Sequence, residues 1–536
     1  MSDTTLTPLR PLPEAAASPA PPEAASTRLR GLLSGALGAL AGIGLSELVA
    51  GALGAPSLLA AIGAVVIDNQ PAGAKDLVVA LFGTNDKLAL EALIVVVAAL
   101  IGAVLGIVAV HRSFALAAAG FGAFAIAGFL ASLRSPAAAP TTAMIVALAG
   151  GIGGVQVMSF LLRSARAERP AGDAPSAVVD PDWSRRGFLL RAGAVAVASA
   201  AAGLLGRRLL EGGTAGGGSV PPIALPAPAE TASIPPGAEL SQAGLTPLIV
   251  PNEAFYRIDT ALITPSVDAA TWRLRIHGLV DRETTLTYAD LAELPLFEQY
   301  VTIACVSNEV GGNLVGNAKW TGVRLRDVLA IAGVQASATQ LVGRSVDGWT
   351  AGMPTAWVMD ERREPMIALK MNDELLPRIH GFPARLIIPG LYGYVSATKW
   401  LSEIELTTLE RFNGYWIPLG WAKDGPILTQ SRIDTPRHGQ SLPAGRVAIA
   451  GVAWAPDRGI SKVEVAIDGV WQEATLSTPI SDATWVQWLV AWDAPPGPHA
   501  ILVRATDGDG MIQASERTPP APDGARGNHA IQVTVG

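Results

Sequence analysis

The chain has 536 residues, of which 50% are hydrophobic and only 16% are charged. This composition is too apolar for an ordinary water-soluble enzyme, so part of the chain is expected to lie in a lipid bilayer. The single cysteine, Cys305, excludes internal disulfides and zinc sites that need several cysteines. The net charge of -7 and the lack of a basic stripe argue against nucleic acid as a partner.

The apolar residues are concentrated in the first 210 positions. Residues 1–27 are rich in Pro, Ala, Ser and Thr and are expected to form a disordered cytoplasmic tail. Residues 28–165 are expected to form a four-helix transmembrane region, because each of its long apolar runs can cross about 30 Å of hydrocarbon. These runs are Leu29 to Leu53, Leu88 to Val110, Phe114 to Leu133 and Thr141 to Leu162.

Two features of this region concern its placement in a membrane. Polar residues interrupt positions 56–86, which favours a loop with interfacial helices over another span. Glu47 lies inside the first span, either as a proton or ion site or as a side chain that reaches the interface. Arg28, Arg112 and Arg163 flank the spans on one side, and this side is therefore predicted to be cytoplasmic.

Residues 166–210 contain the sequence Ser184-Arg185-Arg186-Gly187-Phe188-Leu189, followed by a small-residue apolar run from Ala192 to Leu205. This pattern resembles the twin-arginine export signal, which carries proteins that fold before they cross the membrane. A basic flank that only anchors a fifth span is the alternative. No small-residue cleavage site precedes Arg207, so the segment is expected to remain as a fifth transmembrane helix, with the following residues outside the cytoplasm.

The remainder of the chain has the composition of soluble domains. Residues 211–240 form a Gly/Pro/Ala linker, and residues 241–430 are predicted to be a mixed α+β domain. Residues 431–536 are predicted to be an all-β, immunoglobulin-like sandwich. Predicted strands are Trp272 to Ile276, Arg385 to Ile388, Arg446 to Val452, Lys462 to Asp468, Trp485 to Ala491 and Ala500 to Ala505, and Leu325 to Ile331 is a predicted helix.

Cys305 ends a strand-like run that begins at Val301 and breaks at the Gly311-Gly312 turn. A lone cysteine is more often an inert buried thiol than a ligand when it is considered by itself. A thiolate nevertheless suits a transition metal, and one protein thiolate suffices when a cofactor supplies the other sulfurs.

Four further motifs accompany this cysteine. They are Phe255-Tyr256-Arg257, Asn317-Ala318-Lys319-Trp320-Thr321-Gly322-Val323, His380-Gly381-Phe382-Pro383-Ala384-Arg385 and Ser396-Ala397-Thr398-Lys399-Trp400. In this order they resemble the sulfite oxidase family of molybdopterin enzymes, and the resemblance extends over residues 245–536. It implies a molybdenum-molybdopterin cofactor, with Cys305 as the ligand of the metal and as a catalytic residue.

The resemblance also implies roles for residues around Cys305. His380 and Arg385 would contact the pterin phosphate, and Asp347 would hydrogen-bond the pterin. Arg257 and Tyr415 would hold an oxyanion by charge and hydrogen bonding. The implied cofactor-binding residues are Asn252, Phe255, Tyr256, Arg257, Asp347, His380, Arg385, Ala397, Thr398 and Lys399, and the implied catalytic residues are Cys305, Tyr415 and Arg257.

Several of these assignments have a structural alternative. Ile258 and Asp259 follow Arg257 where the family carries Asn-His, which leaves the role of Arg257 open. Arg385 can instead pair with Glu403 or Glu405, and Tyr415 can cap a loop. Trp320 and Trp400 are expected in the core, because tryptophan commonly packs inside proteins.

The implied activity is that of a molybdopterin-dependent oxidoreductase in a bacterial cell membrane, multi-pass, with its catalytic domain extracytoplasmic. It would transfer an oxygen atom to or from a small sulfur oxyanion or a related substrate. A sulfoxide or oxide reductase of the same fold, and a non-enzymatic membrane-anchored binding or transport protein, are the alternatives.

The expected partners follow from what the chain lacks. It has no c-type haem motif and no cysteines for an iron–sulfur cluster, so no haem is evident and a separate electron carrier or membrane redox subunit is expected. The other expected partners are a small-molecule substrate and membrane lipid. The sandwich resembles a dimerisation domain, which leaves both a homodimer and packing against its own catalytic domain open.

Overall fold

The structure, a computed structural model, describes residues 22–70, 81–82, 86–135, 138–166, 181–211 and 225–536. These residues fall into two compact units, a helical one and a larger one that includes residues 211–536. The predicted tail at residues 1–21 and the linker at 212–224 lie outside the described residues. So do residues 71–80 of the predicted interhelical loop and the side chains of Ser184 and Arg185.

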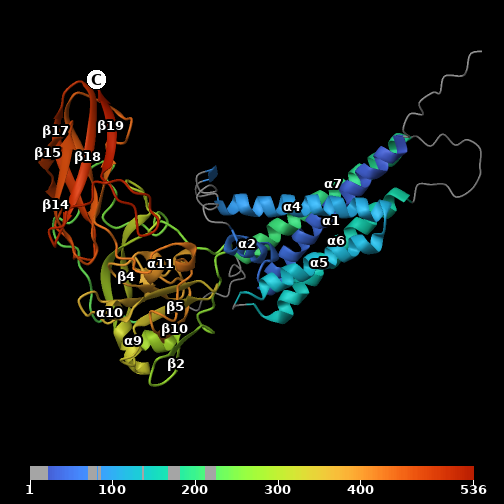
Figure 1. Ribbon diagram of the computed structural model, residues 1–536, viewed down its shortest axis with the longest axis horizontal. Coiled ribbons are helices and arrows are strands. Elements are labelled where there is room, and N and C mark those ends of the chain that lie inside the picture. The colour runs from blue at the N-terminus through green and yellow to red at the C-terminus, as the bar shows by residue number, and fades with distance from the viewer. Residues whose placement is uncertain (1–21, 71–80, 83–85, 136–137, 167–180, 212–224) are drawn as a thin grey trace, which may run out of the picture. The chain divides into compact units, whose positions relative to one another are not determined.

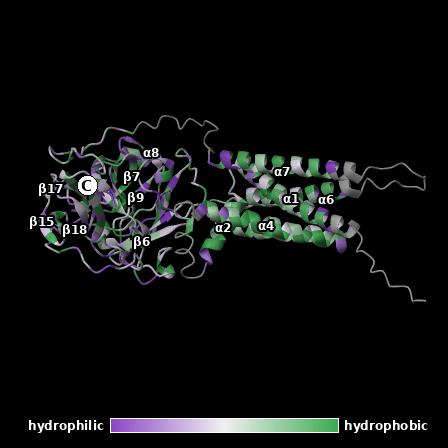
Figure 2. Cartoon of the chain, turned by 90° about the horizontal axis from the view of Figure 1, so that it is seen from above, coloured by the Kyte–Doolittle hydropathy of each residue, from purple (hydrophilic) through white to green (hydrophobic). Residues whose placement is uncertain are grey.

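The helical unit contains five helices that are long and apolar enough to cross a membrane, within the part of the chain that the structure describes. Figure 2 shows hydrophobic residues along much of their length. Its described helices are α1 (Pro22–Leu53), α2 (Leu58–Asp68), α4 (Asp86–His111), α5 (Phe114–Ser132), α6 (Pro140–Arg166) and α7 (Pro181–Glu211). The four predicted spans and the fifth helix correspond to the five long helices.

Small residues bring α1 close to its neighbours. A Cβ atom at Gly35 would lie 2.0 Å from the carbonyl oxygen of Gly102 in α4, and one at Gly42 would lie 2.7 Å from that of Gly150 in α6. Both contacts are too close for any side chain. The glycines of α1 therefore allow the backbones of two neighbouring helices to approach, as in many membrane bundles.

Glu47 is buried at 4% exposure rather than extended toward solvent. One oxygen of its carboxylate accepts hydrogen bonds from the Ser57 hydroxyl at 2.7 Å and from the Leu59 backbone N–H at 3.3 Å. Leu59 belongs to the first turn of α2, whose N–H groups have no partner within the helix. In this arrangement Glu47 links α1 to the start of α2.

The second unit begins with two sheets. The first has the strand order β3-β4-β7-β8, with β9 beside β7, and the second has the order β2-β1-β10-β5-β6. The strands are β1 (Arg273–Gly278), β2 (Thr284–Thr287), β3 (Leu296–Ala304), β4 (Val315–Arg324), β5 (Gln340–Ser345), β6 (Thr350–Pro354), β7 (Met366–Met371), β8 (Glu374–Leu375), β9 (Arg385–Ile387) and β10 (Leu401–Thr407). The helices are α8 (Tyr288–Glu293), α9 (Leu325–Ala332), α10 (Thr355–Val358) and α11 (Gly393–Ser396).

The predicted C-terminal sandwich is confirmed, and Figure 1 shows it in orange to red. Its sheets have the orders β11-β13-β17-β16 and β12-β19-β18-β14-β15. The strands are β11 (Gln430–Thr435), β12 (Ser441–Leu442), β13 (Gly445–Trp454), β14 (Ile460–Ile467), β15 (Val470–Glu473), β16 (Thr475–Leu476), β17 (Val486–Ala494), β18 (Gly497–Asp507) and β19 (His529–Val535). The predicted strands and the predicted helix at 325–331 all appear, with ends shifted by up to three residues.

The α+β region and the sandwich share a boundary that we call the seam. Trp485, just before β17, is fully buried and belongs to the core cluster of the α+β region. Its backbone N–H donates to the Thr302 hydroxyl at 2.8 Å, and its indole N–H donates to the Leu248 carbonyl at 2.9 Å. These contacts join the two folds through one apolar core.

Candidate active site

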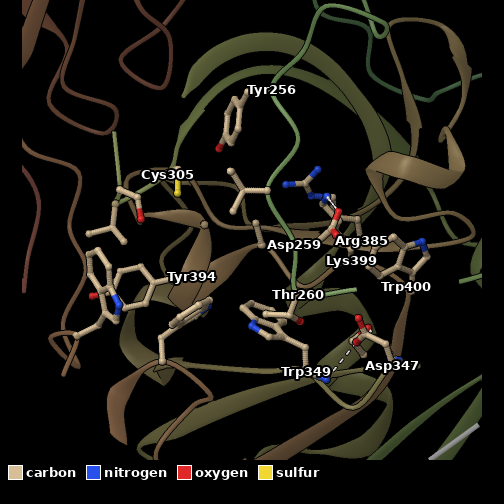
Figure 3. A pocket seen from close by; sticks show the side chains of 18 residues that line it. Tyr256, Asp259, Thr260, Cys305, Asp347, Trp349, Arg385, Tyr394, Lys399 and Trp400 are labelled. Carbon is tan, nitrogen blue, oxygen red and sulfur yellow. Dashed lines mark hydrogen bonds and ion pairs between the residues drawn. The ribbon is translucent and has the colours of Figure 1, made fainter. Parts of the chain in front are cut away.

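A pocket that is partly open to solvent lies in the α+β region. Five loops, one end each of β5 and β9, and the short helix α11 form its wall, and they bring together residues that are far apart in the chain. The lining residues are Tyr256, Ile258, Asp259, Thr260, Cys305, Val306, Ser307, Ser345, Asp347, Trp349, Arg385, Gly393, Tyr394, Ala397, Lys399, Trp400, Trp416 and Trp421. In Figure 3, Cys305 and Tyr394 lie on one side of the pocket, while Arg385, Lys399 and Asp347 lie on the other.

Cys305 directly follows β3, whose side chains are buried at its last five positions. The Cys305 backbone N–H donates to the Leu314 carbonyl at 2.9 Å, and its carbonyl accepts from the Asn308 N–H at 3.0 Å. The chain then turns at Gly311, whose φ of +81° is a left-handed conformation that favours glycine. The strand and the turn together fix the thiol, which is 8% exposed, on the pocket wall.

Two cationic side chains occupy the opposite side of the pocket. Lys399 is held by the Asp259 carboxylate at 3.0 Å and by the Ile379 carbonyl at 3.0 Å. Arg385 donates to the His380 carbonyl at 3.2 Å, and its guanidinium lies 5.3 Å from the centre of the Trp320 ring. Gly381 allows the Lys399 backbone to lie close to its own. It has a φ of +117°, and a Cβ atom there would lie only 3.0 Å from the Lys399 Cα atom.

Burial shifts the proton affinities of these groups. Removal from water lowers the pKa of Lys399 to about 8 and that of Arg385 to about 10, because burial disfavours the charged forms. Burial likewise raises the pKa of Asp347, and hydrogen bonds from Ser345 and the Trp349 N–H partly oppose this rise. It also raises the pKa of Tyr256, with a further contribution from the nearby Cys305 thiol.

Arg385 has an unused hydrogen-bond donor. Its Nε atom is buried and has no partner within the described part of the chain. The side chain is 5% exposed and also lacks a carboxylate partner there, since Glu403 pairs with His277 and Glu405 pairs with Arg344. The alternative pairing of Arg385 with Glu403 or Glu405 is therefore wrong. An unsatisfied buried donor beside a second cation is suited to a phosphate or another anionic group.

The structure brings six of the residues expected at the site to the pocket wall. They are Tyr256, Cys305, Asp347, Arg385, Ala397 and Lys399. The structure also places Trp320 in the core, as expected, whereas Trp400 is buried in the core and lines the pocket as well.

The other expected site residues lie behind the wall or beside it. Asn252 donates to the Met371 carbonyl, and Phe255 packs on His380 with ring centres 5.7 Å apart. Thr398 is fully buried against Gly343. These three residues, together with Arg257, His380 and Tyr415, are not among the lining residues.

His380 and Arg257 each bond a residue that lines the pocket: the His380 carbonyl accepts from Arg385, and Arg257 donates to Asp259. The His380 Nε2 atom lies 2.8 Å from the Asn252 carbonyl oxygen, so this nitrogen carries the proton. Burial lowers the pKa of His380 to about 4, which keeps the ring neutral. Arg257 donates to the Asp259 carboxylate at 2.9 Å and to the Thr264 hydroxyl at 3.0 Å.

Several lining residues were not expected from the sequence. Asp259 was noted only as a departure from a motif, yet it joins Arg257 to Lys399. Trp349, Trp416 and Trp421 form an aromatic part of the wall. The positions of two of them carried a signal, since Trp349 follows Asp347-Gly348 and Trp416 follows Tyr415.

Comparison with known proteins identifies the domain that contains this pocket. Residues 261–416 match the family described as oxidoreductase molybdopterin binding domain. This part of the chain is a molybdopterin oxidoreductase domain. The domain includes Cys305, Asp347, Arg385 and Lys399, whereas Tyr256 and Asp259 precede the matched residues.

The curated relatives of this chain include a sulfite oxidase and a nitrate reductase. Human mitochondrial sulfite oxidase is 30% identical over 319 residues, covering 51% of this chain and 58% of the relative. The NADH nitrate reductase of Hordeum vulgare is 30% identical over 307 residues, covering 45% of this chain and 34% of the relative. The chain thus spans about half the length, or less, of these two relatives.

Among solved structures, the sulfane dehydrogenase SoxCD of Paracoccus pantotrophus is similar to this chain. It is 24% identical, with a TM-score of 0.44, and the match covers 50% of this chain and 75% of that one.

The residues of the pocket fit a molybdopterin. A thiolate is a suitable ligand for a metal whose other sulfurs come from the pterin, and Cys305 carries the only sulfur atom among the described residues that line the pocket. The unsatisfied Arg385 Nε and the Lys399 ammonium supply the positive charge that a pterin phosphate needs. The chain's donor set therefore matches both ends of the cofactor.

Proposed function

We propose that the protein is a membrane-anchored molybdenum enzyme that transfers one oxygen atom to or from a small substrate. The observation that carries this proposal is the shared pocket, in which the Cys305 thiol faces a cationic side formed by Arg385 and Lys399. The membership of residues 261–416 in a molybdopterin-binding family supports the same cofactor.

The bound cofactor would supply two-electron redox chemistry and oxygen-atom exchange with water, and the chain's residues would position it. Cys305 would ligate the metal from the end of β3, where the strand fixes the sulfur. Arg385 and Lys399 would bind the phosphate, and Asp259 would orient the Lys399 ammonium through its 3.0 Å contact. The aromatic wall would exclude water from the reacting atoms.

We further propose that the catalytic domain lies outside the cytoplasm of a bacterial cell. The five long apolar helices support membrane anchoring. The pair Arg185-Arg186, with Phe188 and Leu189, supports export after folding by the twin-arginine route. Because the chain has no motif for a haem or a cluster, a separate electron carrier or membrane redox subunit would complete the electron path.

The variant Cys305→Ser tests this function. The full chain is purified in detergent, its molybdenum content is measured by mass spectrometry, and its dye-linked turnover is measured with oxygen-atom donors and acceptors. We expect wild type to hold close to one molybdenum per chain and Cys305→Ser to lose at least tenfold in turnover, with less metal retained. The control is Ser307→Ala, a neighbouring lining position, which should keep its metal. Equal metal and equal turnover in wild type and Cys305→Ser would refute the proposal.

A further inference from the structure

A second pocket lies inside the helical unit. It is partly open, and helices α1, α2, α4, α5 and α6 form its wall. Among the described residues that line it, Ser46 is the only one with a polar side chain. The Ser46 hydroxyl already donates to the Ile43 carbonyl at 2.8 Å. A wall of this kind binds hydrocarbon, because a polar ligand would lose its hydrogen bonds to water without replacing them.

The pocket is elongated along α4. Its lining residues on this helix begin at Leu90 and end at Leu105, a distance of about 22 Å at the rise of an α-helix. Helix α2 contributes residues from Leu58 to Val66, but its 11 residues extend for only about 16 Å and cannot cross about 30 Å of hydrocarbon. The shape of the pocket therefore suits one long hydrocarbon chain that lies along the helices.

Polar side chains border one end of this pocket. Glu91 directly follows Leu90, the first lining residue of α4, and Glu47 lies four residues after Ile43, a lining residue of α1. Residues four apart share a face of a helix, so the Glu47 side chain lies on the same side of α1 as the pocket. The Glu91 carboxylate pairs with Arg207 of α7 at 2.9 Å. This end of the pocket therefore has hydrogen-bonding groups that the rest of its wall lacks.

One oxygen of the Glu47 carboxyl group is available to a ligand. Its Oε1 atom accepts from Ser57 and from the Leu59 N–H, whereas its Oε2 atom is buried and has no hydrogen-bond partner within the described part of the chain. Leu59 itself lines the pocket, so the carboxyl group lies next to the wall. A buried polar atom without a partner calls for an explanation, and an ionisable residue within a membrane span is a candidate functional site.

The charges at this end favour an uncharged ligand. An anionic phospholipid head would meet the two carboxyl groups of Glu47 and Glu91 against the single guanidinium of Arg207, which already pairs with Glu91. A carboxyl group can accept a hydrogen bond from a hydroxyl when it is ionised and donate one to a carbonyl when it is protonated. The end of the pocket thus suits a neutral head that carries hydroxyls or carbonyls.

We propose that the helical unit binds a membrane quinone, with its hydrocarbon chain in the pocket and its head beside Glu47. A quinone carries carbonyls when it is oxidised and hydroxyls when it is reduced, so the Glu47 carboxyl group can bond either form. The choice of a quinone over another neutral lipid rests on the proposed function, which requires an electron carrier because the chain has no motif for a haem or a cluster.

The test uses the full chain in phosphatidylcholine nanodiscs and decylubiquinone as the probe. The probe is added either oxidised or reduced by dithionite in the absence of air, and native mass spectrometry measures the fraction of chains that retain it. We expect wild type to retain one quinone per chain in both redox states. Added phosphatidylglycerol, an anionic phospholipid, should not displace it.

Two variants test the chain and the head of the ligand separately. Ala98→Phe fills the pocket from α4 and should lower the binding of both forms at least tenfold. The control is Ala92→Phe, at an exposed position of the same helix that does not line the pocket, which should bind as wild type does. Glu47→Gln keeps an oxygen for Ser57 and Leu59, and its amide can still donate to a carbonyl. It should therefore bind the reduced form at least tenfold more weakly and the oxidised form within threefold of wild type.

The outcomes distinguish this inference from the proposed function. Equal binding by Ala98→Phe and Ala92→Phe, or displacement of the probe by phosphatidylglycerol, would overturn the quinone site. An equal effect of Glu47→Gln on both redox forms would overturn the placement of the head. The molybdenum content of the same preparations reports on the proposed function. A chain that binds quinone without molybdenum supports this site and refutes that function, and a chain that holds molybdenum without binding quinone overturns this inference alone.

Discussion

Two buried arginines of the second unit have opposite surroundings. Arg432, at the seam, is 8% exposed and bonds the Asp434 carboxylate at 2.6 Å, the Gly312 carbonyl at 2.9 Å and the Thr246 hydroxyl at 2.8 Å. Arg385, in the pocket, is 5% exposed and has one recorded hydrogen bond, to the His380 carbonyl. A buried charge is tolerated when its donors are satisfied and is costly when they are not.

This difference distinguishes an arginine that is buried to stabilise the fold from one that is buried where a ligand can bind it. The buried donors at the seam bond to acceptors within the chain, as the hydrogen bond from Trp485 to Thr302 also shows. In the pocket, by contrast, the buried Arg385 Nε donor has no partner within the described part of the chain. Unsatisfied buried polar atoms in a folded protein call for an explanation, and a cofactor is the one that fits here.

The largest expected effect on the free energy of unfolding comes from Arg432→Met, with Arg385→Met as the matched comparison. Arg432→Met leaves the buried Asp434 carboxylate without this partner, so the free energy of unfolding should fall by about 3–5 kcal/mol. Arg385→Met leaves no carboxylate without a partner, so the free energy of unfolding of the cofactor-free protein should stay the same or rise by about 1 kcal/mol. Denaturant unfolding of the cofactor-free protein measures both.

Molybdenum content provides the second half of this test. Arg385→Met should lose at least tenfold in cofactor retained after purification, while Arg432→Met, to the extent that it folds, should retain the wild-type ratio of molybdenum to folded chain. If Arg385→Met destabilises the cofactor-free fold as much as Arg432→Met does, both arginines are structural and the comparison fails.

The next effect tests whether the seam joins two folds into one cooperative unit. Trp485→Ala removes a fully buried side chain with two hydrogen bonds at the seam, so the free energy of unfolding should fall by about 3–5 kcal/mol. Trp471→Ala, at a position 37% exposed on β15, should change it much less. Calorimetry should show one transition for residues of both folds in wild type. Two separate transitions in wild type would contradict the shared core.

A smaller effect concerns acid. His380 is fully buried, and its pKa of about 4 lies below the ordinary value of 6.5. Between these pH values the unfolded chain binds a proton that the folded chain does not, so stability is fully present above pH 6.5 and is lost as the pH falls toward 4. At about 1.4 kcal/mol per pKa unit, His380 accounts for a loss of about 3 kcal/mol over this window.

The matched variant for this prediction is His380→Gln, which can still donate to the Asn252 carbonyl. Its stability should depend less steeply on pH than that of wild type. His529 has a similarly lowered pKa of about 4, so it contributes a shared slope that both proteins retain. Identical slopes between pH 7 and pH 5 would show that His380 is not responsible.

Local patterns predicted much of the fold. Alternating apolar residues gave β14 and β18, and the amphipathic run at Leu325 gave α9, because such periodicity records which side of an element is buried. The order of the strands could not be predicted in this way. Strand β10 lies between β1 and β5 and is parallel to β1, and no local pattern encodes such a pairing.

The sequence predicted those site residues that belong to recognisable motifs. Cys305, Arg385 and Lys399 were expected from short motifs, and all three line the pocket. The contact between Asp259 and Lys399 joins residues 140 positions apart, and single-sequence reasoning has no signal for it. The aromatic wall depends on loops whose paths are set by tertiary packing.

The seam also determines where the sulfur atom of Cys305 lies. Thr302, three residues before Cys305, donates its N–H to the Ala483 carbonyl at 2.9 Å and accepts from the Trp485 N–H at 2.8 Å. Residues of the sandwich thus hold the end of β3 in its register, although they lie as many as 183 positions downstream. The C-terminal domain thus belongs to the scaffold that holds Cys305, and a substitution there is expected to displace this proposed metal ligand without touching it.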